Sequence, residues 1–390
     1  MGTEVAGLLN AQVRDAYPVL NDVVYLNVGT YGIMPQGALA EFQSIQADFE
    51  ARGVASGPRS GKGTEDTRAR IATLIGAAGP EEIAFTRNAT DGINLVLAGL
   101  DWQPGDEVIT TEEEHEAMNH PLSYLHTHRG LNFKRLQVSP DADVMIARLN
   151  EAYSPKTRLV AMSFVTCETG TRLPVKAICQ WAAERKLLSL LDGAQVSGAI
   201  KIDVQDIGCD FYTSNGHKWL SGPKGTGFFY CKRDKLEVLS PAHVGAGSLE
   251  KVDVDAGYAE PFHTGQRFEF GTRAWSGTAG LGAALDWFES LGWDNVYGHI
   301  HALNDYLKAR ILERPYLKLL SPIAFEQSSG LTTFVIQEHN AQEVANTLRE
   351  KKKIYTRVIP HFNAMRIATA HFNAPQDIDA LMAALDEICG

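Results

Sequence analysis

The chain has 390 residues, 44% of them hydrophobic and 21% charged, and it carries a net charge of −11 at pH 7. This composition is typical of a soluble globular protein with one large core and a smaller lobe. The acidic balance and the lack of a basic stripe exclude a nucleic-acid binder, because phosphate contacts need clustered Lys and Arg. No apolar run approaches the ~18 residues of a membrane span, so no membrane partner is expected.

Cysteine usage indicates the compartment. The five cysteines are odd in number, and no two form a C-x-x-C pair. We therefore expect neither a disulfide framework nor a structural zinc site. The N-terminal stretch lacks the basic start and apolar core of a signal peptide. A cytoplasmic protein is the expectation.

Short apolar runs alternate with helical patterns through the first two thirds of the chain. Several runs are apolar at every position, which is typical of parallel strands covered on both faces. The alternation predicts an α/β fold, with a largely parallel sheet and helices on both faces. Strands are predicted over 82–86, 107–111, 158–165, 187–192 and 211–214, and helices over 91–100 and 175–186.

The pattern changes after about residue 280 and predicts a smaller α+β domain. We expect a large domain over 31–280, a small domain over 281–390, and a segment 1–30 that packs with the small domain. The predicted elements of the small domain are helices over 281–290, 296–312 and 341–351 and from 377, and strands over 331–337 and 364–370 and one ending near 357.

Lys218 and Asp192 indicate the cofactor. Asp192 ends an apolar strand, and Lys218 follows the next strand in the run TSNGHKW. A lysine amine can hold a carbonyl cofactor as a Schiff base, and a carboxylate can hold the protonated ring nitrogen of pyridoxal phosphate. An exposed lysine and a capping aspartate are the structural alternatives for the two residues taken singly. The pair predicts a pyridoxal-phosphate enzyme acting on an amino acid.

His115 follows the strand over 107–111 in the run HEAMNH. A zinc-protease helix needs histidines at i and i+4, whereas His115 and His120 are separated by five positions, so no metal is predicted. The alternatives for His115 are a plain loop histidine and an imidazole that stacks on the cofactor ring and moves protons. Beside Asp192 and Lys218, the second is preferred.

The run RNATDG lies between a predicted strand and a predicted helix. The free N–H groups of a helix N-terminus, here at Ala89 and Thr90, suit a phosphate group. The Thr90 hydroxyl could add a further hydrogen bond. An N-cap role for Thr90 or Asp91 is the simpler alternative, and the two roles are compatible.

Seven stretches together resemble the class V aminotransferase family of fold-type I pyridoxal-phosphate enzymes. They are RNATDGINLVL, GDEVITTEEEHEAMNHP, SFVTCETGTRLPV, DGAQVSGAIKIDV, YTSNGHKWLSGPKGTGFFY, FEFGTRAWS and MRIATAHFN. The segment NGHKWLSGPKGTG is most similar to the isopenicillin-N-epimerase and cyst(e)ine C–S lyase branch. The resemblance implies an aspartate-aminotransferase-like large domain with a mostly parallel seven-stranded sheet, together with a smaller α+β domain.

The resemblance also implies roles for single residues. Lys218 would be the Schiff-base lysine, Asp192 the partner of the ring nitrogen and His115 the ring stacker. Arg366 would bind the substrate carboxylate, with Arg357 placed for a second anionic group. A homodimer with shared active sites is implied as well. The remaining cofactor contacts would come from Gln195 near the phenolic oxygen, Asn215 beside the lysine, Thr90 and His217 on the phosphate, and Thr272 on the phosphate of the neighbouring subunit.

One departure from the family decides the expected reaction. Cysteine desulfurases carry a nucleophilic cysteine before the final arginine, but residues 356–364 contain no Cys. On this ground a desulfurase is disfavoured, and β-elimination by a C–S lyase with Lys218 as base is preferred. Cys167 is interpreted as a packing thiol.

Several alternatives stay open. Epimerisation would need a second proton donor, for which Tyr31 and His361 are the candidates. Transamination and decarboxylation are further options after loss of the Cα proton. A non-catalytic cofactor-binding protein is the least favoured hypothesis, because both Lys218 and Asp192 are present.

Overall fold

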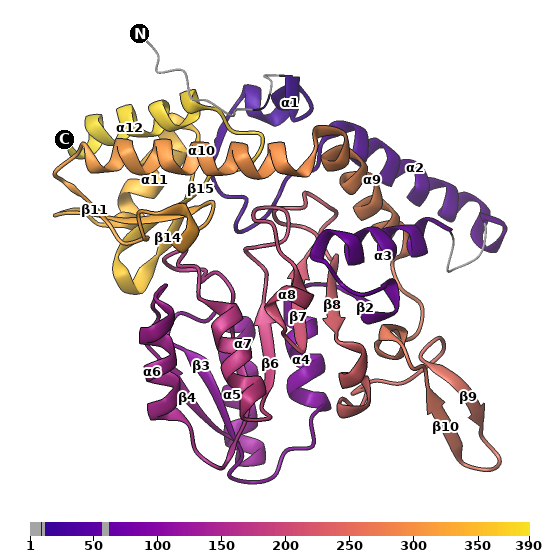
Figure 1. Ribbon diagram of the computed structural model, residues 1–390. Helices are drawn as coiled ribbons and strands as arrows, with labels where there is room; N and C mark the ends of the chain where they lie inside the picture. Colours follow the sequence, from indigo (N-terminus) through magenta and orange to yellow (C-terminus); the bar gives the residue numbers. More distant parts are fainter. Residues whose placement is uncertain (1–8, 10–11, 57–61) are drawn as a thin grey trace.

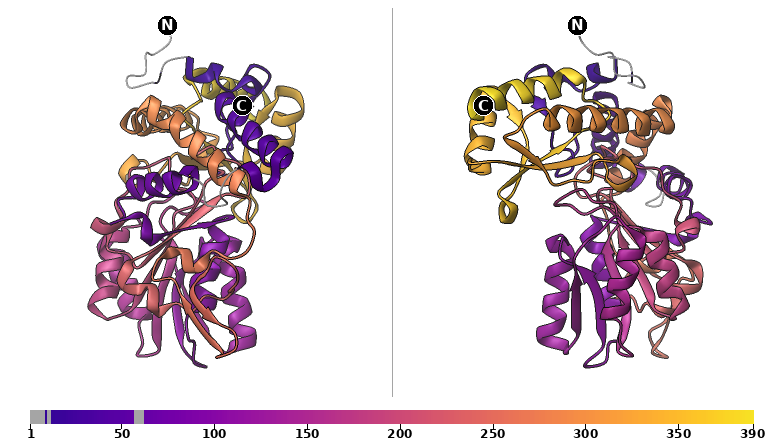
Figure 2. Two further views of the ribbon diagram at one scale, coloured as in Figure 1. Left: turned by 90° about the vertical axis from the view of Figure 1, so that its right-hand side faces the viewer. Right: turned by 60° about the vertical axis from the view of Figure 1, so that its left-hand side comes forward.

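The computed structural model describes residue 9, residues 12–56 and residues 62–390. Two lobes are evident in Figures 1 and 2. The larger one is built on a seven-stranded sheet, and the smaller one on a four-stranded sheet near the chain's end. Part of the expected 1–30 segment, residues 1–8, 10 and 11, lies outside the described residues.

The large sheet is mostly parallel. Only β8 runs antiparallel to its neighbours β2 and β7, while the other four pairings are parallel. In spatial order the strands are β2 (Ile83–Thr86), β8 (Gly227–Cys231), β7 (Phe211–Asn215), β6 (Leu188–Asp192), β5 (Thr157–Ser163), β3 (Glu107–Thr111) and β4 (Asn132–Leu136).

Helices cover both faces of this sheet, which explains the continuous apolar runs of its central strands. On one face pack α4 (Ala89–Gly99) and α5 (Glu116–Arg129). On the other pack α3 (Lys62–Ile75), α6 (Ala142–Ala152), α7 (Val175–Glu184) and α8 (Val204–Ile207). The predicted fold class is therefore confirmed.

The small lobe has its own apolar core, to which strands and helices of the C-terminal third contribute. Its sheet has the order β11 (Leu317–Leu319), β12 (Leu331–Ile336), β15 (Ala364–Ala368) and β14 (Arg357–Ile359), all antiparallel. Its helices are α10 (Trp293–Leu312), α11 (Ala341–Lys352) and α12 (Pro375–Cys389). The early strand β1 (Val24–Tyr25) pairs in parallel with β13 (Ile354–Tyr355), so the N-terminal segment contacts this lobe.

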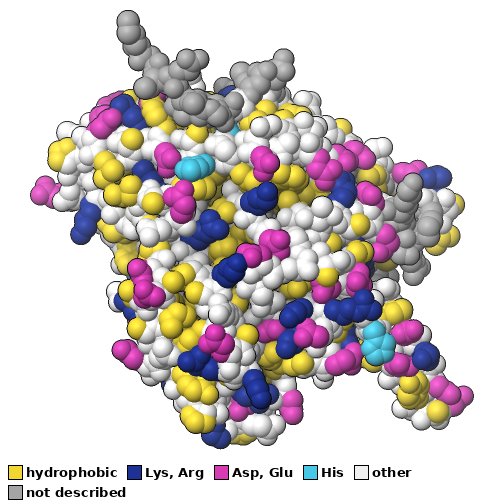
Figure 3. All heavy atoms as spheres, in the orientation of Figure 1, with side chains coloured by type: hydrophobic (Ala, Val, Ile, Leu, Met, Phe, Trp, Pro, Cys, Tyr) yellow, Lys and Arg dark blue, Asp and Glu magenta, His cyan; other side chains and the backbone are white. Residues whose placement is uncertain are grey.

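The remaining elements join or extend the two lobes. They are α1 (Gln12–Asp15), α2 (Gln36–Arg52), α9 (Trp275–Leu291) and the hairpin of β9 (Leu249–Asp253) and β10 (Tyr258–Pro261), which projects from the large lobe in Figure 1. On the face drawn in Figure 3, acidic and basic side chains are interspersed. Among the helices in residues 12–56 and 62–390, none is both long and apolar enough to cross a membrane.

Candidate active site

The candidate residues gather where the parallel strands end. β3, β5, β6 and β7 have their carboxyl ends at one edge of the sheet, the usual ligand-binding edge of α/β folds. The small lobe closes over this edge through loop 166–170. There Thr333 Oγ1 donates to the carbonyl of Glu168, and Ser321 Oγ donates to the carbonyl of Thr169, each at 2.5 Å.

Lys218 lies in the turn after β7, half-buried between the sheet edge and the N-terminal segment. Among the described residues its amine has no hydrogen-bond partner in the protein. Burial lowers the pKa of Lys218, and the negative charge of Asp192 opposes that shift. A lowered pKa favours the neutral, nucleophilic amine that covalent catalysis needs.

Glycine is required beside Lys218. The amide of Gly32 donates to the carbonyl of His217 at 2.8 Å. A Cβ on Gly32 would lie 2.1 Å from the carbonyl oxygen of Lys218, closer than any real contact. Residues 27–32 therefore pass directly against the lysine turn.

Asp192 is the last residue of β6 and is buried. The amide of Ala194 donates to its Oδ1 at 2.8 Å, and within the described chain Oδ2 has no hydrogen-bond partner. Burial raises the pKa of Asp192, while the Ala194 bond and the charges of Lys218 and His115 oppose the shift. One oxygen is thus left for a cationic or N–H partner.

His115 is the N-cap of α5. Its Nδ1 accepts a hydrogen bond from the amide of Ala117 at 3.1 Å. Burial lowers the pKa of His115, and the positive charge of Lys218 lowers it further. The ring is therefore neutral with its proton on Nε2. A pocket of about 760 Å³ has His115 and Thr90 among its lining residues.

The N-terminus of α4 differs from the prediction. The N-cap is Asn88, whose side chain accepts from the amide of Asp91 at 3.0 Å, rather than Thr90 or Asp91. The amide of Ala89 is already donated to Oδ1 of Asn215 at 3.0 Å. Ala89 and Asn215 thus bind each other. The hydroxyl of Thr90 has no protein partner in the described residues, so it is left to bind a ligand.

Two further side chains that were predicted to contact the cofactor already form hydrogen bonds with other groups of the protein. Gln195 is buried, receives a hydrogen bond from Trp219 Nε1 at 2.9 Å and donates to the carbonyl of Gly29 at 3.0 Å. One amide hydrogen of Gln195 remains free. His217 Nδ1 is hydrogen-bonded to the carbonyl of Thr226 at 3.2 Å, and burial lowers its pKa.

Arg366 reaches the site from β15, in the middle of the small-lobe sheet. Its Nη1 donates to the carbonyl of Cys167 at 2.5 Å and its Nη2 to Thr30 Oγ1 at 3.2 Å. Its Nε is buried without a partner in the described residues, and burial lowers the pKa of Arg366 to about 10. A buried guanidinium with a free N–H is suited to a carboxylate ligand.

The other predicted substrate contacts lie nearer the surface. Arg357 is the cross-strand partner of Arg366 and is exposed. Tyr31 is exposed, with its ring centroid 6.1 Å from that of His217. Thr272 is also exposed, on the segment that precedes α9. Its predicted role concerns a second subunit, so this single chain leaves that role a prediction.

Glu114 is a site residue that the sequence reasoning missed. Its carboxylate accepts from the amide and hydroxyl of Ser163 and from Thr111 Oγ1, over 2.6–3.0 Å. Burial raises the pKa of Glu114 to about 7, and the charge of Asp192 contributes in the same direction. Glu114 ties the ends of β3 and β5 together beside His115. A carboxylate run directly after a buried strand was the available signal.

The family described as Aminotransferase class-V matches residues 37–381. The chain belongs to the class V aminotransferase family. Its cofactor is pyridoxal 5′-phosphate. The residues fit that group, because the amine of Lys218 and Oδ2 of Asp192 each lack a protein partner in the described chain.

Several relatives are named for reactions of sulfur amino acids. A cysteine desulfurase from Serratia proteamaculans (strain 568) is 32% identical over 407 residues, covering 97% of each chain. Among solved structures, the cystine C–S lyase C-DES in complex with its reaction product cysteine persulfide is 28% identical, with a TM-score of 0.87 over 95% of this chain and 98% of that one. A C-DES mutant with glycine covalently linked to the cofactor has a TM-score of 0.88 at 27% identity, over 95% and 98% of the two chains.

These comparisons correct the predicted reaction. Disfavouring a cysteine desulfurase was wrong, because proteins of that name match nearly the whole chain. An epimerase is not supported by the relatives named here. The prediction gave one missing loop cysteine too much weight. Such a thiol decides where the sulfur goes, whereas Lys218, Asp192 and Arg366 concern the steps at Cα and the carboxylate.

Proposed function

We propose that the protein is a cysteine desulfurase, which removes the sulfur of L-cysteine and leaves alanine. The observation that carries the proposal is the meeting of Lys218, Asp192, His115 and Arg366 at one sheet edge, where their charges act on one another. The desulfurases among the relatives support the same reaction.

Each residue then has a chemical task. Pyridoxal phosphate, when bound, supplies an electron sink that weakens bonds at Cα and makes the Cβ–Sγ bond breakable. Arg366 holds the substrate carboxylate through its free N–H. Lys218 Nζ takes the Cα proton and later returns a proton. Asp192 stabilises positive charge at the sheet edge, and the Nε2–H of His115 is a hydrogen-bond donor.

The sulfur acceptor is, in this proposal, a thiol from solution. Residues 357–364 form a tight hairpin between β14 and β15 without a cysteine. Cys179, Cys209 and Cys231 are buried. Cys389 is in the last turn of α12.

The thiol nearest the site is unsuited to the task. Burial raises the pKa of Cys167 to about 12, so that thiol stays protonated, whereas the thiolate is the nucleophile. The balanced reaction is L-cysteine plus RSH giving L-alanine plus RS–SH. The acceptor thiol is oxidised to a persulfide, and Cβ is reduced to a methyl group.

A homodimer is part of the proposal. The β9–β10 hairpin and its surroundings expose Val252, Val254, Tyr258 and Phe270, with Val254 84% exposed. Apolar side chains that project on a hairpin are typical of surfaces covered by a partner. A second copy of the chain would also bring its exposed Thr272 towards a cofactor site, as the family resemblance implies.

The test is a product balance. Purified holoenzyme with L-cysteine and dithiothreitol should release sulfide and alanine in equal amounts. Without dithiothreitol, L-cysteine is the only thiol in solution, so the sulfur should be recovered as a low-molecular-weight persulfide and no persulfide should form on the protein. Sulfide accompanied by pyruvate and ammonia, or a persulfide on a cysteine of the protein, would contradict the proposal.

A further inference from the structure

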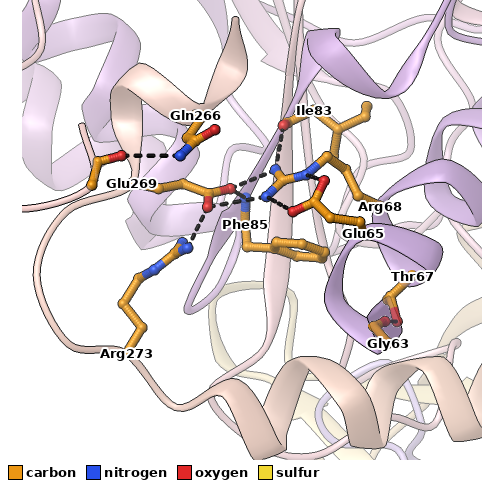
Figure 4. Close-up of polar contacts among 10 residues, drawn as sticks. Gly63, Glu65, Thr67, Arg68, Ile83, Phe85, Gln266, Glu269 and Arg273 are labelled. Atoms are coloured by element: carbon orange, nitrogen blue, oxygen red, sulfur yellow. Dashed lines mark hydrogen bonds and ion pairs between the residues drawn. The ribbon is translucent and has the colours of Figure 1, made fainter. Parts of the chain in front are cut away.

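A buried ion network lies beneath the segment that carries Thr272. At its centre is Glu269, whose side chain is 2% exposed. Arg68 and Arg273 approach it from two sides in Figure 4. Arg68 donates to both carboxylate oxygens, at 2.6 and 3.2 Å, and Arg273 donates to Oε2. The amide of Phe85 completes the set with a 2.7 Å hydrogen bond to Oε1.

Arg68 anchors the network to the large-lobe core. It is buried, donates to the carbonyl of Ile83 at 2.7 Å, and stacks over Phe85 with 4.6 Å between Cζ and the ring centroid. Burial alone would raise the pKa of Glu269, but the bonds and charges of Arg68 and Arg273 outweigh it and lower the pKa. Glu269 is therefore a fixed anion, and breaking one partner away leaves a buried charge uncompensated.

The two network members Glu269 and Arg273 bracket an exposed segment. Phe270, Gly271 and Thr272 lie between them in sequence, and all three are exposed. Gly271 has a φ of +68°, which only glycine adopts easily, and its amide donates to the carbonyl of Ala246 at 2.8 Å. Residues 270–272 thus form a short exposed arch that is held to the core at both ends. No neighbour within the described chain binds the threonine of this arch.

We infer that the Arg68–Glu269–Arg273 network is a positioning device that presents Thr272 to the cofactor phosphate of a second copy of the chain. The inference rests on the homodimer of the proposed function. Arg273 acts through the segment and touches no cofactor itself. A rigid arch lowers the ordering cost of binding, because its conformation is set before the partner arrives.

The first test separates phosphate recognition from stability. Arg273→Met should raise the Kd of the apoenzyme for pyridoxal phosphate about tenfold and leave the Kd for pyridoxal, which lacks the phosphate, unchanged. Arg273→Lys should recover part of the affinity. The control is Arg310→Met, since Arg310 pairs with Glu313 at 2.7 Å and its side chain is 32% exposed, against 31% for Arg273. Equal losses for both ligands would overturn the inference.

The second test asks which subunit the network serves. A heterodimer of Lys218→Ala and Arg273→Met subunits, purified through two different tags, keeps one lysine-bearing site. That site lies in the Arg273→Met subunit, and the neighbouring Lys218→Ala subunit supplies it with an intact arch. If the network acts on the neighbouring subunit, the site binds pyridoxal phosphate as the wild type does. If binding stays as weak as in the Arg273→Met homodimer, or if the holoenzyme is a monomer, the inference fails. Neither result depends on whether L-cysteine is the substrate.

Discussion

Nδ1 of His115 accepts a hydrogen bond from the backbone amide of Ala117, so the imidazole caps the helix that it begins. This bond fixes the tautomer, because a nitrogen that accepts cannot carry the proton in the neutral ring. The free Nε2–H is the group left for chemistry. His115 therefore has a structural and a chemical task on different nitrogens, and substitutions can separate them.

His115→Asn should keep the cap and lose the chemistry. Asparagine is among the best N-cap residues, so the melting temperature should stay near that of the wild type, while kcat for L-cysteine falls about 100-fold with the loss of the imidazole ring and its Nε2–H. His115→Ala should lose both, with about 1 kcal/mol less stability. Thermal melts and desulfuration rates measured on both variants check this. Equal stability of the two would show that the cap is unimportant.

Lys218→Ala should abolish desulfuration, with a loss of at least about 1,000-fold, because both the covalent anchor and the base are removed. Borohydride reduction followed by peptide mass analysis should attach the cofactor to Lys218 in the wild type. The matched control is Lys224→Ala, whose amine donates to the carbonyl of Gly32 at 2.6 Å in the same loop. Attachment at another lysine, or turnover by Lys218→Ala, would refute the assignment.

Arg366→Lys should raise the KM for L-cysteine about 10- to 100-fold. A lysine keeps the positive charge but loses the planar fork that can bind a carboxylate while still holding Cys167 and Thr30. Arg349→Gln on the exposed side of α11 should leave KM unchanged. Initial-rate kinetics on the wild type and the two variants measure these KM values. A fall in kcat at constant KM would place Arg366 outside the substrate contact.

Two buried histidines should make the fold sensitive to acid. Burial lowers the pKa of His299 to about 4 and that of His371 to about 3. Since the unfolded value is near 6.5, each contributes stability that is fully present above pH ~6.5 and is lost as the pH falls towards the folded value. The expected loss between pH 7 and 5 is about 2 kcal/mol per histidine.

Urea denaturation at the two pH values measures that loss. His371→Gln can still bond the hydroxyl of Tyr17, which lies 2.6 Å from the histidine Nε2 in the wild type. The variant should show a smaller difference between pH 7 and pH 5. An undiminished pH dependence would mean that other groups cause it.

Much of the sheet was predictable because its central strands are buried on both faces. The strand predicted over 187–192 is observed as Leu188–Asp192, and that over 107–111 agrees at both ends. The edge strand β4 was not predicted from its pattern, since NFKRL is half polar and one of its sides faces solvent. β8 was hidden by the glycine-rich turn before it.

The residues of the candidate site likewise divide into those that the strand pattern predicts and those that it does not. Asp192 ends a strand and Lys218 and His115 each follow one, so the strand pattern alone brings them to one edge. Asn215 and Ala89 were expected to bind the cofactor separately, but they bind each other, because a pairing across 126 positions is invisible in sequence. Glu114 was missed because three consecutive glutamates suggest a solvated face, whereas Glu113 and Glu114 are buried.

The order of the site residues along the chain bears on protein synthesis. The substrate carboxylate is expected to meet Arg366, near the C-terminus, whose guanidinium is held by Thr30, near the N-terminus. A nascent chain can complete the lysine-bearing sheet long before β15 has been made. Cofactor capture can thus precede substrate binding during synthesis. A product truncated before β15 would carry the reactive lysine but lack the arginine that binds the substrate carboxylate.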